Sequence, residues 1–269
     1  MRDHLHDLVN RHGGDSNQKW CLAREYLQAR ILQCLQECGV FTKWAMQGGT
    51  ALRFLYSLPR FSEDLDFAMA KTGMETGFEA SIQRAKFTFE AEGYSLAVKV
   101  KAEKTVATAF IRFPGLPFDL GLSPHTEQVL SVRVEIDANP PAGATLDTTI
   151  VRRHLLLHLH HYDRATLLAG KLHAILSRPW CKGRDLYDLA WYLADKTWPE
   201  PNVLFLNAAL QQTGWSGPVV SPVNWREIIA GTLENLDVRE ALEDVRPFLE
   251  RPADLEMLER GNLLRLLKG

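Results

Sequence analysis

The stretch QGGTALRFLYSLPRFSEDLDF, residues 47–67, joins a glycine pair to a crowded set of carboxylates. Gly48 and Gly49 open it, and Asp64 and Asp66 lie near its end. Two acids that stand two residues apart at the entry to a strand point to the same face of a sheet, where their charges repel each other. A divalent cation that binds both carboxylates together with phosphate oxygens removes this repulsion. The pattern therefore indicates a site for Mg²⁺ and a nucleotide, although an isolated pair of this kind is often a solvated surface feature.

The glycine pair lies between an expected strand, VFTKWAMQ (40–47), and an expected short helix, TALRFLYSL (50–58), which ends before Pro59. A glycine turn at this position lets backbone N–H groups approach an anion, and the N-terminus of the following helix adds partial positive charge. Thr50 offers a hydroxyl that caps the helix or contacts a phosphate. No Gly-Lys-Ser/Thr sequence follows, so this is not a Walker A motif, and the pair taken alone is more typical of a structural turn.

A third carboxylate is expected from VLSVRVEIDA (129–138), whose alternation is typical of a strand with one apolar face. The polar face of this strand holds Arg133, Glu135 and Asp137. Either Glu135 or Asp137 completes a set of three metal ligands with the aspartate pair. Glu135 is favoured because it is central to the strand, whereas Asp137 lies near the strand end and also suits a turn.

The composition is that of an ordinary globular protein, with 269 residues of which 46% are hydrophobic and 24% are charged. This length suits one large domain or two modest ones. The formal net charge of −2 argues against a protein that coats nucleic acid, but it leaves room for a local basic groove. The N-terminus lacks the apolar core of a secretory signal, and the chain lacks a long uncharged apolar run. These features predict a cytoplasmic protein with no membrane span.

Strands and helices are mixed in the first half of the chain, and helices alone fill the second half. Helical periodicity is found in residues 18–38 and 75–92. Further strands are expected at 65–69, 94–102, 105–113 and 155–160. The helices expected after residue 163 span 164–178, 184–195, 203–213, 224–234, 237–248 and 253–267. The fold class is therefore predicted as α+β, with a mixed-sheet lobe in residues 1–150 and a mainly helical lobe in residues 151–269.

Two blocks of the sequence carry a family resemblance. GGTALR (48–53) followed by RFSEDLDF (60–67) resembles the AbiEii/AbiGii-type nucleotidyltransferase toxins, which belong to the superfamily with the DNA polymerase β catalytic fold. LLAGKLHAILSRPWCKGRDLYDLAWYL (167–193) is similar to a later block of that family, in which a helical Lys precedes a basic turn and R-D-x-x-D-L. The resemblance covers about residues 40–195. It implies a polymerase β-like nucleotidyltransferase lobe, followed by a helical lobe that completes the active site and serves to bind the acceptor or a partner.

The resemblance also implies a role for each matched residue. The residues expected to bind the nucleotide triphosphate are Gly48, Gly49, Thr50, Arg53, Arg60, Ser62, Lys171 and Asp185. The residues expected to hold Mg²⁺, as two ions, are Asp64, Asp66 and either Glu135 or Asp137. The expected catalytic set is Asp64, Asp66, Glu135, Lys171 and Asp188. In that set Lys171 neutralises phosphate charge, and Asp188, with Asp185, orients Lys171 or the nucleotide.

Three of these residues also have plain structural explanations. A helical lysine such as Lys171 is usually solvated. Asp185 suits the first turn of a helix because of the helix dipole. Arg60 has Glu63 nearby in the sequence as an ion-pair partner within its own loop.

The expected function is Mg²⁺-dependent transfer of a nucleoside monophosphate from an NTP to an acceptor. The resemblance implies an RNA acceptor such as the tRNA 3′ end, and a toxin of a toxin–antitoxin or phage abortive-infection system that a separately encoded antitoxin restrains. Basic side chains that suit an RNA groove are Lys99, Lys101, Lys104, Arg152, Arg153, Arg178, Lys182 and Arg184. Trp180 is suited to stack on a base. The alternatives are transfer to a small molecule, as in antibiotic-modifying relatives, transfer to a protein, and a non-catalytic nucleotide-binding module.

Overall fold

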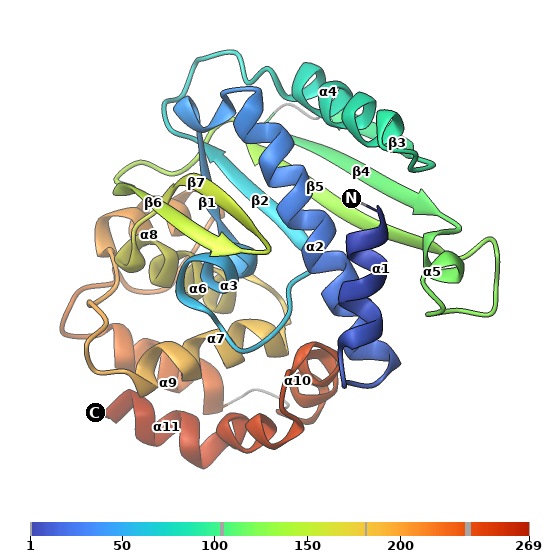
Figure 1. Ribbon diagram of the computed structural model, residues 1–269. Helices are drawn as coiled ribbons and strands as arrows, with labels where there is room; N and C mark the ends of the chain where they lie inside the picture. The colour runs from blue at the N-terminus through green and yellow to red at the C-terminus, as the bar shows by residue number, and fades with distance from the viewer. Residues whose placement is uncertain (1, 103–104, 181, 235–237, 269) are drawn as a thin grey trace. The chain divides into compact units, whose positions relative to one another are not determined.

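A computed structural model describes residues 2–102, 105–180, 182–234 and 238–268, which form a mixed β-sheet and a set of helices (Figure 1). The strands are β1 (Trp44–Gln47), β2 (Asp64–Met69), β3 (Ala97–Ala102), β4 (Val106–Pro114), β5 (Val129–Asp137), β6 (Leu146–Arg153) and β7 (Leu155–Tyr162). The α-helices are α1 (Arg2–Arg11), α2 (Ser16–Glu37), α3 (Gly48–Tyr56), α4 (Phe78–Ala91), α5 (Leu116–Asp119), α6 (Arg164–Ser177), α7 (Gly183–Ala194), α8 (Val203–Gln212), α9 (Trp225–Glu234), α10 (Val238–Val245) and α11 (Arg260–Lys268). The 3₁₀ turns are η1 (Val40–Thr42), η2 (Arg246–Phe248) and η3 (Pro252–Leu258).

The chain divides into two compact units. Unit 1 consists of Met1–Ser57, Phe61–Pro140 and Thr148–His161. Unit 2 consists of Leu58–Arg60, Pro141–Asp147 and Tyr162–Gly269. Unit 1 holds most of the sheet, and unit 2 holds the helices from α6 onward together with a short piece of the early motif. The functional division at residue 150 stays a prediction, and Lys104 of the predicted basic set lies outside the described residues.

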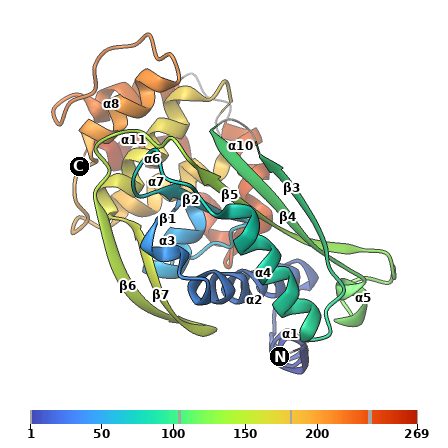
Figure 2. The ribbon, with the colours of Figure 1, turned by 90° about the horizontal axis from the view of Figure 1, so that it is seen from above.

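The sheet of unit 1 has the strand order β3-β4-β5-β2-β1-β7-β6. Strand β2 is parallel to β5 and antiparallel to β1, so the sheet is mixed, as the α+β prediction requires. Leu65 and Phe67 of β2 are at most 1% exposed. The ring of Phe67 contacts Trp44, and Trp44 in turn contacts Phe78 at the start of α4. Helices α2 and α4 pack beside each other on this apolar face (Figure 2), and the residues that alternate with it point to the other face.

The segment before the glycine pair differs from the predicted strand over 40–47. Val40–Thr42 forms the turn η1, and only Trp44–Gln47 is extended. Gly39 precedes the turn with a φ of 72°, and this left-handed residue redirects the chain after α2. The glycine pair does not separate strand from helix, because Gly48 is itself the first residue of α3.

Two helices and one strand were not predicted from the sequence, namely α1, the four-residue helix α5 and the edge strand β6. Helix α1 buries only Leu5 and Val9, which gives too short an apolar pattern to detect. In β6 only Val151 is buried, so the period-2 alternation that identified the other strands is absent.

The helices of unit 2 pack closely enough to require a glycine at the start of α7. A Cβ atom added to Gly183 would lie 1.7 Å from the carbonyl oxygen of Ala241 in α10. Any side chain here would therefore separate α7 from α10. Among the described helices of the chain, none has the length and apolar character that a membrane crossing requires.

Candidate active site

The acids predicted from β2 and β5 lie on one face of the sheet in unit 1. In the parallel register Asp66 stands opposite Glu135, and Asp64 stands opposite Arg133. Because opposed residues of paired strands point to the same side, Asp64, Asp66 and Glu135 share the face that α2 and α4 leave uncovered. Thr108 of β4 donates to Glu135 Oε1 at 3.0 Å and fixes that carboxylate. We call the three acids the carboxylate face.

The glycine turn packs directly against this face. A Cβ atom added to Gly48 would lie 2.6 Å from Asp66 Oδ2, and Gly48 has a φ of 76°. Thr50 is fully buried, and its hydroxyl donates to the carbonyl oxygen of Asp64. The start of α3 and the aspartate pair therefore form one packed structure. The Thr50 hydroxyl has a structural partner here, and its contact with a phosphate stays a prediction.

We expect Gly48→Ala to displace Asp66 and so to lower the transfer activity strongly. The free energy of unfolding should fall only modestly. Gly73 offers a matched control because its φ is 77° and a Cβ there meets nothing within 4 Å. Both substitutions place alanine in the left-handed region, which costs about 1–2 kcal/mol. Denaturant unfolding should show similar losses for both variants, while a nucleotide-transfer assay should show a large loss for Gly48→Ala alone. Equal activity of the two variants would contradict the role given to the Gly48–Asp66 contact.

Arg133 is a member of this site that the sequence reasoning did not assign. Its Nη2 donates to Asp64 Oδ2 at 2.6 Å, and its Nη1 lies 3.3 Å from Glu135 Oε1. The hydrogen bond to Asp64 raises the pKa of Arg133 further, against a lowering by burial. The signal was present in the sequence, because Arg133 alternates with Glu135 on the polar face of the same strand.

The register separates the two candidates for the third acid. Glu135 stands opposite Asp66, whereas Asp137 stands opposite Ala68 and Val106. The Asp137 carboxylate accepts a hydrogen bond from the Asn139 N–H at 2.8 Å, which is a strand-end turn contact. Burial raises the pKa of Asp137 despite that bond. The geometry therefore favours Glu135.

The carboxylate face suits Mg²⁺ in its chemistry. Its donors are carboxylate oxygens, which Mg²⁺ prefers, and Gly48 leaves the space beside Asp66 free of a side chain. In the part of the chain that the structure describes, no group of three or more His, Cys, Asp or Glu side chains is gathered as a metal site. The guanidinium of Arg133 contacts both Asp64 and Glu135.

Arg53, predicted to contact the nucleotide, is buried in a different cluster of unit 1. Its Nε donates to Glu25 Oε2 at 2.5 Å, and its guanidinium lies 4.5 Å from the ring of Phe61. Glu25 also contacts Arg153 at 3.0 Å and His154 at 2.8 Å. Burial would raise the pKa of Glu25, but the hydrogen bond from His154 and the charges of Arg53 and Arg153 outweigh it and lower the pKa to about 2. The charge of Arg53 is thus balanced within the protein.

We expect this cluster to make stability depend on acid pH. The pKa of Glu25 is lower in the folded chain than its ordinary 4.5, so its contribution is complete above about pH 5 and is lost as pH falls toward 2. The loss should be on the order of 3 kcal/mol. Glu25→Gln lacks this contribution at every pH, so its free energy of unfolding should decline less across that range. If urea unfolding gave equal declines in the free energy of unfolding for the wild type and Glu25→Gln, Glu25 would not be the group responsible.

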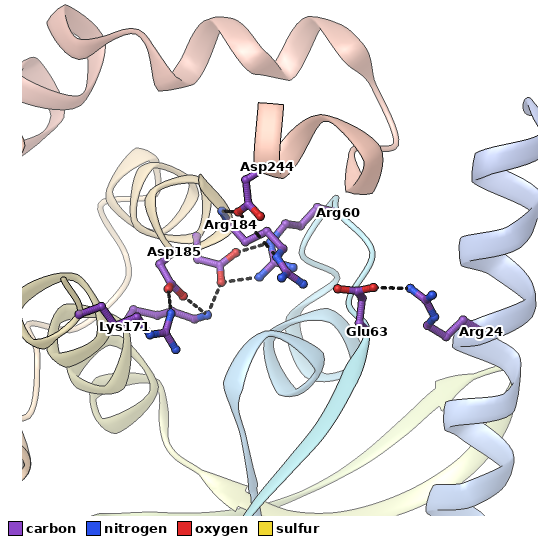
Figure 3. Close-up of polar contacts among 9 residues, drawn as sticks. Arg24, Arg60, Glu63, Lys171, Arg184, Asp185 and Asp244 are labelled. Carbon is purple, nitrogen blue, oxygen red and sulfur yellow. Dashed lines mark hydrogen bonds and ion pairs between the residues drawn. The ribbon is translucent and has the colours of Figure 1, made fainter. Parts of the chain in front are cut away.

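Four of the remaining predicted residues form a largely buried ion cluster within unit 2 (Figure 3), namely Arg60, Lys171, Asp185 and Asp188. Arg60 Nε and Nη2 donate to Asp188 Oδ1 and Oδ2, each at 2.6 Å, so two parallel bonds hold the carboxylate. Lys171 Nζ lies 2.6 Å from Asp188 Oδ2 and 3.0 Å from Asp185 Oδ1. Arg178 Nη1 donates to Asp185 Oδ2. We call these five residues the lysine cluster; its three cations and two carboxylates leave one net positive charge.

The electrostatics of the lysine cluster keep Lys171 protonated. Burial alone would lower the pKa of Lys171, but the charges of Asp188 and Asp185 outweigh it and raise the pKa. In the same way, burial would raise the pKa of Asp185, and the charges of Lys171 and Arg178 lower it. At neutral pH Lys171 can therefore supply positive charge and donate hydrogen bonds, but it cannot serve as a base.

The structure places the other candidates as follows. Glu63, the expected loop partner of Arg60, is bonded instead by Arg24 of α2 at 2.9 Å (Figure 3). Arg60 is 2% exposed, and its guanidinium donates hydrogen bonds to Asp188. Its contact with a nucleotide stays a prediction. Ser62 is half-buried, and its carbonyl oxygen accepts from Gln28 at 3.1 Å. Trp180 is 65% exposed.

Solved structures share this fold. A candidate nucleotidyltransferase from H. pylori aligns with a TM-score of 0.59 at 21% identity, over 92% of this chain and 93% of its own. JHP933 from Helicobacter pylori aligns with a TM-score of 0.56 at 20% identity, over 92% of this chain and 90% of its own. MenT4, a nucleotidyltransferase toxin from Mycobacterium tuberculosis H37Rv, aligns with a TM-score of 0.56 at 17% identity, over 100% of this chain and 89% of its own. These likenesses show that the chain shares the fold of these structures, which is consistent with the predicted α+β, polymerase β-like class.

A family model identifies the chain more directly. No curated protein is similar to it at a significant level. The model described as "Nucleotidyl transferase AbiEii toxin, Type IV TA system" matches residues 30–260. The match continues well beyond residue 195, where the sequence reading found no further resemblance. The chain belongs to the AbiEii family of nucleotidyltransferase toxins, and it is a nucleotidyltransferase.

Proposed function

We propose that this nucleotidyltransferase depends on Mg²⁺ and transfers a nucleoside monophosphate from an NTP to an RNA acceptor such as the tRNA 3′ end. The observation that carries the proposal is the register of β2 and β5, which sets Asp64, Asp66 and Glu135 on one face beside the start of α3. In this reaction the acceptor hydroxyl oxygen bonds to the α-phosphorus, and the bond to the β-phosphate oxygen breaks, so that pyrophosphate leaves.

The carboxylate face would hold the metal. Asp64, Asp66 and Glu135 would supply three carboxylates, and Glu135 would also accept the proton of the acceptor hydroxyl. When bound, Mg²⁺ would draw charge from the phosphate oxygens and lower the pKa of the attacking hydroxyl. The first N–H groups of α3 belong to Gly48 and Gly49, and they are suited to bind an anionic phosphate.

The lysine cluster would neutralise phosphate charge. Lys171 stays protonated because Asp188 and Asp185 surround its Nζ, and the cluster retains one net positive charge. In this proposal Asp188 is a positioning residue that directs the Lys171 ammonium. Little covalent chemistry is asked of the protein, so positioning and charge carry the rate.

Exposed basic and aromatic side chains support RNA as the acceptor. Lys99 and Lys101 lie on the same face of β3 and are exposed. Trp180, which follows Arg178 by two residues in the sequence, is exposed and offers a surface for base stacking. A type IV toxin family further supports a separately encoded antitoxin as partner.

The test is incubation of the protein with Mg²⁺, each α-labelled NTP in turn, and total cellular RNA together with cell protein. Label in RNA that is absent with the Asp64→Asn/Asp66→Asn variant supports the proposal and names the nucleotide. Label in a protein band or a small molecule, with none in RNA, overturns the RNA acceptor. Measurable NTP binding with no transfer to any fraction also overturns the RNA acceptor, because cellular RNA was present.

A further inference from the structure

The guanidinium of Arg133 occupies the place between two acids that a shared metal ion would need. Arg133 Nη2 donates a hydrogen bond to Asp64 Oδ2 at 2.6 Å, and Nη1 lies 3.3 Å from Glu135 Oε1. A cation that binds both oxygens has to break both contacts. The positive charge also reduces the formal charge of the carboxylate face from three negative charges to two.

The ion pairs of Arg133 with Asp64 and Glu135 are exposed enough for a cation to displace the guanidinium. Arg133 is 36% exposed as a side chain, and Asp64 and Glu135 are each 26% exposed. Ion pairs with this much solvent contact contribute little to stability, because water and salt screen them. The Arg60–Asp188 pair, with at most 2% exposure, is held far more firmly. The guanidinium can therefore leave the acids at small cost, and its long side chain keeps it near the same face.

We propose that Arg133 is a resident counter-ion of the carboxylate face, which a divalent cation displaces when it binds Asp64 and Glu135. This inference rests on the metal dependence proposed above. Without metal, Arg133 relieves the repulsion among the three acids. With metal bound, the released guanidinium carries its charge beside the incoming phosphates. Arg133 thus sets the metal concentration at which the site fills.

The test is the binding of Mn²⁺ to the full chain without nucleotide, followed through the electron spin resonance signal of free Mn²⁺. Arg133→Gln should bind Mn²⁺ about tenfold more tightly, because a competing unit charge has been removed a few ångströms from the ligands. Arg133→Lys keeps the charge and should stay near the wild-type affinity. Arg112→Gln is the matched control, since Arg112 is an exposed arginine of β4 on the same face whose guanidinium lies 5.8 Å from the Phe110 ring.

The outcomes separate this inference from the proposed function. Tighter binding by Arg133→Gln, with Arg112→Gln within about twofold of wild type, supports the counter-ion role. Unchanged or weaker binding by a folded Arg133→Gln overturns it and makes Arg133 an organiser of the ligands. Absence of Mn²⁺ binding in every variant, with or without an NTP, overturns the metal dependence itself.

Discussion

Asp66→Asn should lower the rate of nucleotide transfer by about a thousandfold or more while the protein stays folded. The amide keeps the shape of the side chain but loses the charge that a metal ligand and a phosphate-transfer site require. Asp66 stands opposite Glu135 and directly against Gly48 at the start of α3. Stability should change little, because the substitution removes one of three mutually repelling charges.

The comparison variants make this expectation specific. Asp147→Asn changes an exposed aspartate of β6 and should keep wild-type activity. Glu135→Gln should follow Asp66→Asn, whereas Asp137→Asn should retain much more activity because its carboxylate serves the turn at Asn139. Transfer by a folded Asp66→Asn at a rate within tenfold of wild type would refute the proposed catalytic role of the carboxylate face. We would measure initial rates of label transfer and, in parallel, denaturant unfolding.

Arg60→Gln should destabilise the folded chain by about 3–5 kcal/mol, the usual cost of leaving a buried charge without its partner. Arg60 is 2% exposed, and the Asp188 side chain is fully buried with both oxygens bonded to it. Glutamine cannot supply the charge or the two-pronged geometry. Asp188 would then rely on Lys171 alone, so the position of the Lys171 ammonium should change as well.

A surface pair with the same spacing gives the control. Arg226 contacts Glu200 at 2.6 Å, but their side chains are 38% and 56% exposed. Arg226→Gln should therefore cost below about 1 kcal/mol. Urea unfolding of both variants measures the difference between a buried and an exposed pair of equal length. Similar midpoints for Arg60→Gln and wild type would show that Arg60 is not the structural partner of Asp188.

Local sequence patterns predicted those parts of the fold that local forces determine. The alternation of Val132, Val134 and Ile136 correctly located β5, because a half-buried strand has one apolar face. The amphipathic period likewise located α6 and α7. Strand β6 was missed because an edge strand with one buried residue carries no such pattern.

The candidate site was predicted less evenly, because ion-pair partners are set by tertiary structure. The motif RFSEDLDF identified the aspartate pair, but nothing in it shows that Arg60 pairs with Asp188, 128 residues later. The GGTALR block likewise gave no sign that Arg53 meets Glu25 of α2. The alternation of Arg133 with Glu135 placed it on the polar face of its strand, but its pairing with Asp64 follows from the register of β2 and β5, which a single sequence does not reveal.

Nucleotidyl transfer by this protein can be tested by following both ends of the nucleotide in one reaction. The protein would be incubated with Mg²⁺, cellular RNA and an NTP labelled in parallel samples at the α- or the γ-phosphate. We expect α-label to enter RNA and γ-label to appear in pyrophosphate in equal amount, and both signals to be lost with Asp64→Asn/Asp66→Asn. Entry of γ-label into the acceptor, or pyrophosphate release that survives the double substitution, would contradict this expectation.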